Sequence, residues 1–215
     1  MSFMDLLPPL LHGAGITIQL TVYSAALAFV VAVAAGIGRL SKYKLVRIPI
    51  IAYIEFFRGT SLLVQLFWIF FVLPLFGITL SKMMAGVLAL GLNYGAYGAE
   101  VVRGAIQSVP KGQTEAGIAL NMTPWQRMRR IIFPQAFVMM IPPFGNLIIE
   151  LLKGTALVSL IGLYDMTYEA LLLRTEAIYM TPIILGMLLV LYFVIAFVIN
   201  TGMRWLERKA AVGRS

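Results

Sequence analysis

The sequence predicts an all-α integral membrane protein with five transmembrane helices, an N-terminus outside and a C-terminus in the cytoplasm. Apolar residues make up 60% of the 215-residue chain, compared with ~45–50% in ordinary globular proteins. Only 12% of the residues are charged, too few to cover a water-exposed surface. Long apolar runs alternate with short basic clusters, which is the pattern of transmembrane helices and their cytoplasmic loops. We therefore expect one transmembrane domain over residues 1–215.

The composition excludes several classes of protein. The net charge of +8 comes from basic clusters beside apolar runs rather than from a basic stripe, so we expect no nucleic-acid binding. The chain has no cysteine and a single histidine, His12, which leaves no ligand cluster for a metal site. Without a cysteine or a suitably placed histidine there is no activated nucleophile, and we expect no catalytic residues.

The first span is expected at about residues 16–37, where 22 residues can cross ~30 Å of hydrocarbon. Upstream of it, Pro8 and Pro9 are expected to interrupt the helix and to leave a short apolar segment along the membrane interface. A basic cluster after the span places that end in the cytoplasm. The cluster consists of Arg39, Lys42, Lys44 and Arg47.

The second span is expected at about residues 48–74, with Glu55 and Arg58 in its first third. Their i, i+3 spacing allows the two side chains to pair on one face of the helix. The pair is either a structural ion pair or part of a gate or coupling device.

The third span is expected at about residues 83–99 and is rich in small residues. Gly91 and Gly95 have the GxxxG spacing that lets another helix approach closely. The neighbour is either a helix of the same subunit or a second subunit. Glu100 and Arg103, again one turn apart, are expected to close this helix on the inside and have the same candidate gate or coupling role.

The stretch over residues 100–136 is too polar to cross a membrane and is expected to form two short cytoplasmic helices. Ser108 is the expected cap of a first helix over residues 110–120, and Asn121 is suited to the left-handed conformation that ends it. A Thr-Pro-Trp-Gln capping box starts the second helix at Thr123. From these patterns alone, the pair either forms a docking surface or only anchors the protein at the interface.

The fourth span is expected at about residues 141–163, because the apolar run from Ile131 onward is too long for one straight helix. Three prolines are expected to end or kink the helix there: Pro134, Pro142 and Pro143. This placement puts Glu150 and Lys153, which could neutralise each other, near the middle of the membrane.

The fifth span is expected at about residues 182–201, after an outside polar segment over residues 164–180. The basic residues that follow fix the C-terminus inside. On this topology 14 of the 17 lysines and arginines are cytoplasmic or beside the cytoplasm.

Polar groups within the spans are candidate solute contacts, because burying a charge in a bilayer is costly and such residues are commonly functional. Each could equally bond a neighbouring helix. The candidate substrate-pathway residues are Gln65, Asn93, Tyr97, Glu150, Lys153, Thr155 and Ser159.

The run GAYGAEVVRGAIQSVPKGQTEAGIALNMTPWQRMRRIIFPQA resembles the EAA-loop region of ABC importer permeases, specifically the polar amino acid uptake family. The Glu-Ala-Ala, Gly and Ile-x-Leu-Pro pattern of that family is matched by Glu115, Ala116, Ile131 and Pro134. Further matches lie at Phe57-Arg58-Gly59-Thr60 and Leu157-Val158-Ser159, so the resemblance covers nearly the whole chain. Gly117, Asn121 and Phe133 depart from the family pattern.

The resemblance implies a type I ABC importer permease in a bacterial inner membrane. It implies three protein partners: an ABC ATPase dimer on the cytoplasmic face, a second permease subunit (a copy or a paralogue) and a periplasmic solute-binding protein. It also implies contact with membrane lipid. The chain has no GxxxxGK[ST] loop, so ATP is expected in the partner and no cofactor in this chain. The implied ATPase-coupling residues are Glu115, Ala116, Gly117, Leu120, Asn121, Thr123, Pro124 and Pro134.

The resemblance also bears on the solute. The family often has an acidic residue after the lysine and a serine two positions further on, and this chain has Gly154 and Ala156 instead. We therefore expect a less acidic pathway and a neutral, zwitterionic or modified amino acid, such as an opine or an ectoine-like compound. The alternatives are a self-sufficient secondary carrier or channel, which does not explain the two capped helices, and a membrane-embedded enzyme, which lacks its nucleophile.

Overall fold

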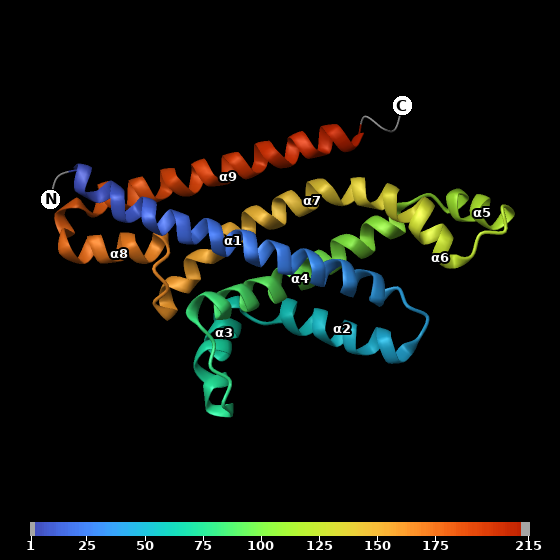
Figure 1. Ribbon diagram of the computed structural model, residues 1–215, viewed down its shortest axis with the longest axis horizontal. Coiled ribbons are helices and arrows are strands. Elements are labelled where there is room, and N and C mark those ends of the chain that lie inside the picture. The colour runs from blue at the N-terminus through green and yellow to red at the C-terminus, as the bar shows by residue number, and fades with distance from the viewer. Residues whose placement is uncertain (1–2, 212–215) are drawn as a thin grey trace.

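The computed structural model describes residues 3–211, and this part of the chain contains helices and no β-strand. The molecule is elongated, with α5 and α6 at one end and α8 at the other (Figure 1). In chain order the elements are α1 (Phe3–Arg39), α2 (Lys44–Gly59), α3 (Leu62–Phe67), η1 (Trp68–Val72), η2 (Leu73–Phe76), α4 (Lys82–Ser108), α5 (Lys111–Ala119), α6 (Pro124–Arg127), η3 (Met128–Ile132), α7 (Phe133–Gly154), η4 (Thr155–Ile161), α8 (Met166–Glu176), η5 (Ile178–Met180) and α9 (Thr181–Ala211).

Helix α1 is continuous from Phe3 to Arg39, so the predicted break at Pro8 and Pro9 is wrong. An interior proline costs about 3 kcal/mol because it removes a backbone hydrogen bond and crowds the preceding turn. Here Leu6 and Leu10 are fully buried against residues of α8 and α9. The dense van der Waals contacts of these two leucines with α8 and α9 help to offset the cost of the prolines.

Helices α1 and α4 form a close-packed seam at the centre of the molecule. Added Cβ atoms at Gly91 and Gly95 would lie 2.6 Å from the Cδ2 of Leu27 and 2.9 Å from the Cγ1 of Val31, respectively. The glycines therefore let the two helices approach, as GxxxG spacings do in lipid. The neighbour that the third span was expected to have is a helix of the same subunit.

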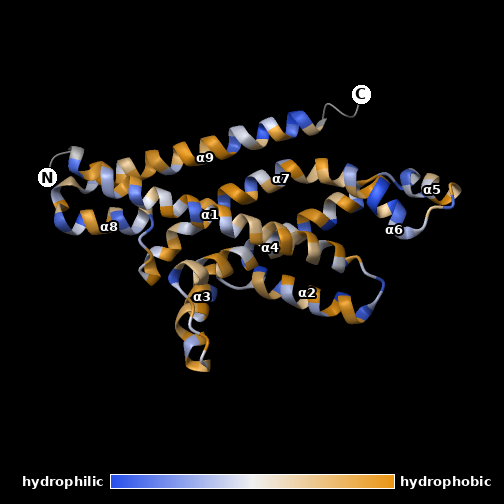
Figure 2. Cartoon of the chain, viewed as in Figure 1, coloured by the Kyte–Doolittle hydropathy of each residue, from blue (hydrophilic) through white to orange (hydrophobic). Residues whose placement is uncertain are grey.

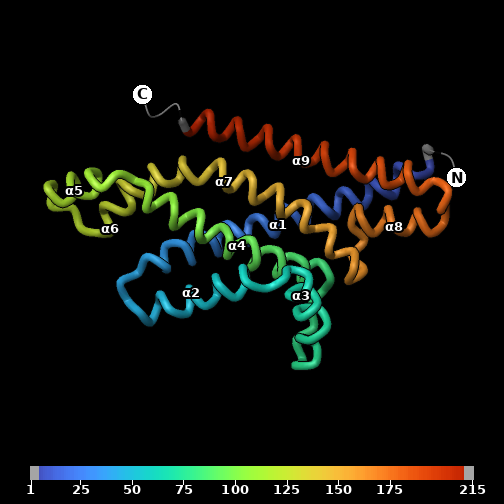
Figure 3. Tube along the Cα trace, turned by 180° about the vertical axis from the view of Figure 1, so that it is seen from behind, coloured from blue at the N-terminus to red at the C-terminus, as the bar shows by residue number. Residues whose placement is uncertain are grey.

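The predicted second span is broken rather than continuous. It ends as α2 at Gly59, Thr60 is extended, and a second part begins as α3 at Leu62. The two parts, Lys44–Gly59 and Leu62–Phe76, meet at 106°. Seen from behind, α2 lies beside α4 while α3 and the turns after it project away from the bundle (Figure 3). The apolar composition of the run gave no signal of this break.

A nearly continuous helical path leads from α6 through η3 into α7. The helix widens to a π turn over Met128–Ile132, directly before Pro134, whose ring removes one helical hydrogen bond. Of the two outcomes predicted for Pro142 and Pro143, an end or a kink, the first is wrong, because both prolines lie inside α7. The helical run therefore starts well before residue 141 and extends as one candidate span over Pro124–Ile161.

By length and hydropathy, three helical stretches of the described chain could each cross a membrane, and the bent pair around Gly59 makes a possible fourth. The three are Asp5–Arg39, Pro124–Ile161 and Ile178–Ala210. Figure 2 shows the apolar residues along these helices and the polar ones concentrated around α5, α6 and the end of α9. Little of the last stretch is buried, so α9 presents most of its apolar surface outward.

Asp165 caps helix α8 from a buried position. Its carboxylate accepts hydrogen bonds from the backbone N–H groups of Thr167 and Tyr168, at 3.1 and 3.0 Å. The next residue, Met166, donates its N–H to the hydroxyl of Thr17 on α1, which ties the start of α8 to α1. Burial raises the pKa of Asp165 to about 6, because desolvation of the carboxylate outweighs its hydrogen bonds.

Gly98→Ala tests the α1–α4 seam, with Gly104→Ala in the same helix as its matched control. A Cβ atom at Gly98 would lie 2.7 Å from the Cβ of Ala32, whereas one at Gly104 would meet nothing within 4 Å. We expect Gly98→Ala to destabilise the protein by about 1–3 kcal/mol through overpacking. Gly104→Ala should be neutral or stabilise by up to about 1 kcal/mol. Melting temperatures in detergent measure both, and equal values would contradict the seam.

Asp165→Asn tests the buried cap, because asparagine keeps the acceptor and removes the charge. The folded-state pKa of Asp165 is raised, so its contribution to the free energy of unfolding is greatest below about pH 4 and falls as the pH rises to about 6. The loss amounts to at most about 3 kcal/mol. We expect Asp165→Asn to gain melting temperature over the natural protein more at pH 7.5 than at pH 5. The exposed Glu176→Gln is the control, and equal gains at both pH values would refute the assignment.

Candidate functional site

Helices α5 and α6 form a protruding hairpin, here called the coupling hairpin and defined as residues 111–127. It extends beyond the ends of α4 and α7 (Figure 1). Ser108 does not cap it, contrary to the prediction. Helix α4 continues past Glu100 to Ser108, whose hydroxyl donates to the carbonyl of Ala105. The same hydroxyl lies 3.1 Å from the sulfur of Met139, so Ser108 joins α4 to α7 instead.

The turn of the coupling hairpin has the predicted chemistry. Asn121 adopts the left-handed conformation, with φ 54°, and the N–H of Met122 bonds the carbonyl of Gly117 in a Schellman arrangement. The capping box is formed, because the Thr123 hydroxyl accepts from the N–H of Gln126 while the Gln126 side chain accepts from the N–H of Thr123. Both ends of the turn are therefore fixed by local hydrogen bonds.

Arg127 clamps the two helices of the hairpin, a role that sequence reasoning missed. Its guanidinium donates to the carbonyl of Met122 at 2.7 Å. A Cβ atom at Gly117, which is buried, would lie 2.7 Å from the Cδ of Arg127. The missing methyl group at position 117 makes room for the arginine stem. The departure of Gly117 from the family pattern was the available signal.

The outer surface of the coupling hairpin is apolar and exposed. Ile118, Leu120 and Trp125 are 54%, 73% and 69% exposed. Glu115 is exposed on α5, the helix that also carries Ile118. Exposed apolar side chains gathered at a tip are typical of a protein-binding surface, and a nearby charge adds specificity. Of the other predicted coupling residues, Pro134 lies away from the hairpin at the start of α7.

A charge cluster joins three helices near the hairpin end of the bundle. Arg39, at the end of α1, pairs with Glu100 of α4 and lies 3.8 Å from Glu55 of α2. Arg103 pairs with Glu100 at 3.0 Å, but the two do not close the helix as predicted, because α4 continues to Ser108. Glu55 thus pairs with Arg39 rather than with Arg58, contrary to the prediction, because the tertiary packing brings the end of α1 beside α2. The guanidinium of Arg58 lies over the ring of Tyr97 instead.

Gln65 and Asn93 hold together the break in the second span. The Gln65 amide donates to the Phe57 carbonyl and to the Thr60 hydroxyl, and the Asn93 amide donates to both the Phe57 carbonyl and Gln65 Oε1. Both side chains are buried, at 6% and 5% exposure. The two amides thus share the Phe57 carbonyl, near the end of α2, where a broken helix leaves carbonyl groups without helical partners. Gln65 and Asn93 therefore have a structural role, because they stabilise the break between α2 and α3.

Glu150 and Lys153 are both exposed on α7 and do not neutralise each other: no ion pair within 4.0 Å joins them in the described chain. Tyr97 is 38% exposed. Thr155 and Ser159 are buried, and their hydroxyls donate to carbonyls three residues back, of Leu152 and Ala156. The candidate pathway residues thus divide into an exposed group and a buried group.

Gly154 lies beneath the hydroxyl of Tyr94. A Cβ atom at Gly154 would lie 2.9 Å from that hydroxyl, which donates to the backbone carbonyl of Glu150. An acidic side chain at position 154 would therefore have to displace Tyr94.

Residues 26–212 match the family described as "Binding-protein-dependent transport system inner membrane component". The chain is 51% identical over 213 residues to a "Probable amino-acid ABC transporter permease protein" of Sinorhizobium fredii, which covers 96% of this chain and 89% of the relative. It is 33% identical over 211 residues to the "Glutamine transport system permease protein GlnP" of Escherichia coli, with 96% and 94% covered.

The fold has counterparts among solved structures. One is a chain in the "Crystal structure of an amino acid ABC transporter with histidines", with a TM-score of 0.87 and 34% identity over 97% of this chain and 99% of that one. Another is a chain of the MetNI methionine ABC transporter in an inward-facing conformation, with a TM-score of 0.81 over 98% and 99%. At 20% identity, the second likeness concerns the fold alone.

Proposed function

Because this chain belongs to the family of inner membrane components of binding-protein-dependent transport systems and is a permease subunit of an ABC importer, we propose that it forms the path of an amino acid or amino-acid-like solute. The solute class follows from the relatives that are named for amino acids. A second permease subunit, either a copy or a paralogue, completes the path. A periplasmic solute-binding protein delivers the solute.

The proposed topology has five spans in a bacterial inner membrane, with the N-terminus outside and the C-terminus in the cytoplasm. Helix α4 supplies the fifth span in addition to the three helices and the bent pair. Its 27 residues extend about 40 Å, which is more than the ~30 Å of hydrocarbon. The clustering of 14 of the 17 basic residues supports the cytoplasmic placement of the coupling hairpin.

The coupling hairpin is the proposed docking site of the ATPase dimer, and this exposed apolar tip is the structural observation that carries the proposal. Ile118, Leu120 and Trp125 offer apolar area, and Glu115 offers a charge for a basic group of the partner. The ATPase binds and hydrolyses ATP, whereas this chain is not an enzyme and binds no cofactor.

Movement at the hairpin reaches the membrane through the helical path of α6, η3 and α7. This path starts at Pro124 and passes Glu150 before α7 ends at Gly154. The charge cluster around Arg39 joins α1, α2 and α4 at the same end, so its rearrangement is the proposed gating step. A rigid helix transmits displacement better than a loop, because its backbone hydrogen bonds fix its length.

The proposed polar contacts of the solute are Glu150, Lys153 and Tyr97, because these side chains are exposed and can face a second subunit. Gln65, Asn93, Thr155 and Ser159 act by fixing the geometry of the helices that carry them. The uncharged Gly154 beside Lys153 supports a neutral or zwitterionic solute, including opine-like and ectoine-like compounds.

Glu115→Lys tests the docking site. Reversing this exposed charge on the hairpin should lower the amount of ATPase subunit that co-purifies with the tagged permease by about tenfold, as expected for the loss of an interfacial charge pair. Solute uptake should fall with it. The matched control is Glu176→Lys, a reversal on the exposed surface of α8 at the opposite end, which should leave ATPase retention unchanged. Full retention and uptake in Glu115→Lys would refute the docking site.

Gly154→Asp and Gly154→Ala together test the solute class. Both add a Cβ atom that crowds the Tyr94 hydroxyl, and only the first adds a charge. In competition assays we expect the natural protein to prefer a zwitterionic solute over lysine or arginine. Gly154→Asp should shift the preference toward the cationic solutes by about tenfold relative to Gly154→Ala, since a hydrogen bond to a charged group contributes about 1.5–3 kcal/mol. A natural protein that prefers arginine or lysine would disprove the proposed class.

A further inference from the structure

An apolar groove of about 440 Å³ lies between α1, α7 and the last part of α9. Its walls are carbon-rich: Phe144 and Ile148 come from α7, Ala25 from α1, and Met203 and Leu206 from α9. Tyr94 also lines the groove, and its hydroxyl donates to the backbone carbonyl of Glu150. Among the described residues that line the groove none is acidic, so it offers no carboxylate for the ammonium of an amino acid, which separates it from the proposed solute path.

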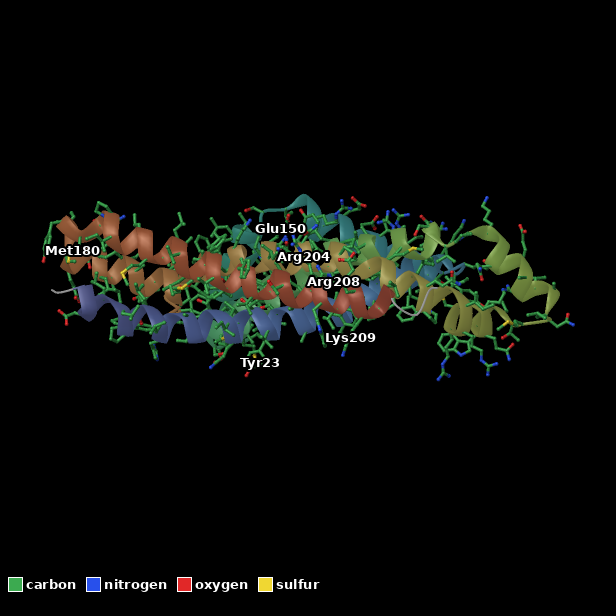
Figure 4. All side chains as sticks on the ribbon, turned by 90° about the horizontal axis from the view of Figure 1, so that it is seen from above. Tyr23, Glu150, Met180, Arg204, Arg208 and Lys209 are labelled. Atoms are coloured by element: carbon green, nitrogen blue, oxygen red, sulfur yellow. The ribbon has the colours of Figure 1, made fainter. Side chains whose placement is uncertain are left out.

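One basic side chain lines this groove. Lys209 stands on α9, three residues after Leu206, and its ammonium lies 4.1 Å from the centroid of the Trp205 ring. No carboxylate of the described chain lies within 4.0 Å of it. Figure 4 places Lys209 on the side of the molecule where α1 and Tyr23 lie. Lysine and tryptophan together are typical of the headgroup level of a membrane.

We propose that this groove binds an anionic phospholipid, with an acyl chain against α1 and α7 and its phosphate on Lys209. The lining of α7 runs from Phe137 to Leu151, about 21 Å at 1.5 Å per residue, so an acyl chain entering at Lys209 can lie along it through one leaflet. An apolar cavity is not stably filled by water, and in a membrane hydrocarbon is its natural filling. The unpaired ammonium selects an anionic headgroup over a neutral one.

The bound lipid would hold the end of α9 to the bundle. Helix α9 packs on α7 and α8, with little of its apolar span buried. An acyl chain in the groove adds contacts between α9, α7 and α1 that the protein itself does not supply. The proposal does not depend on which solute crosses the membrane.

A photoactivatable phosphatidylglycerol with a diazirine on its acyl chain tests the site, with the full permease–ATPase complex in phosphatidylethanolamine nanodiscs. We expect labelling of groove residues such as Phe144 and Met203, mapped by mass spectrometry. Lys209→Gln should reduce this labelling about fivefold, the equivalent of about 1 kcal/mol per lysine at an anionic membrane surface. Lys42→Gln, an exposed lysine that does not line the groove, is the matched control and should change nothing.

Three further measurements complete the test. Ala25→Phe should fill the groove and abolish labelling there, while a correct melting temperature shows that the variant is folded. A photoactivatable phosphatidylethanolamine should label the groove about fivefold less than the anionic probe. Equal labelling by the two probes, or by Lys209→Gln and the natural protein, would overturn the proposal. So would a disulfide between two copies carrying Leu206→Cys, because the chain has no cysteine of its own and a second copy would then occupy the groove.

Discussion

The close approach of α1 and α4 is the contact on which the rest of the structure depends. Without side chains at Gly91, Gly95 and Gly98, the two helices meet at distances that a Cβ atom would prevent. Helices α2 and α7 pack on this pair, and α8 packs on α1. In lipid there is little hydrophobic gain from bringing helices together, so association relies on dense van der Waals packing. Small residues at this seam are therefore a condition of the fold, and the charge cluster of Arg39, which joins the same helices, depends on the seam for its geometry.

A second constraint is that backbone polar groups need partners away from water. At the break after Gly59, the buried amides of Gln65 and Asn93 supply those partners from α3 and α4. Polar residues in a span first suggest a solute path, and here the same residues let a helix bend by 106° inside an apolar bundle. The proposed solute path uses the exposed polar groups of α4 and α7 instead. The coupling hairpin connects to those groups through the long run of α6, η3 and α7, in which the prolines are accommodated without ending the helix.

Much of the fold and of the coupling hairpin could be predicted from the sequence, because the signals are local. Apolar composition indicated membrane helices, and the capping box at Thr123 and the left-handed Asn121 located the hairpin turn within a residue or two. Such motifs involve side chains and backbone groups only a few positions apart. The resemblance to ABC importer permeases likewise rests on short sequence patterns such as Glu115-Ala116 and Ile131 to Pro134, and the comparisons confirm it.

Other features were decided only by the tertiary structure. Whether Pro8 and Pro142 interrupt a helix depends on the packing that surrounds them, and neighbouring residues in sequence do not report it. The partner of Glu55 is Arg39 rather than Arg58, because two helices distant in the chain lie side by side. The side chain of Arg127 packs against α5 because Gly117 has no side chain to block it. The sequence by itself determined the class of protein, its apolar helices and the hairpin turn, through local periodicity and capping. The tertiary structure decided where helices bend, which charges pair and which polar groups stay exposed, because these depend on the relative free energies of contacts between segments far apart in the chain.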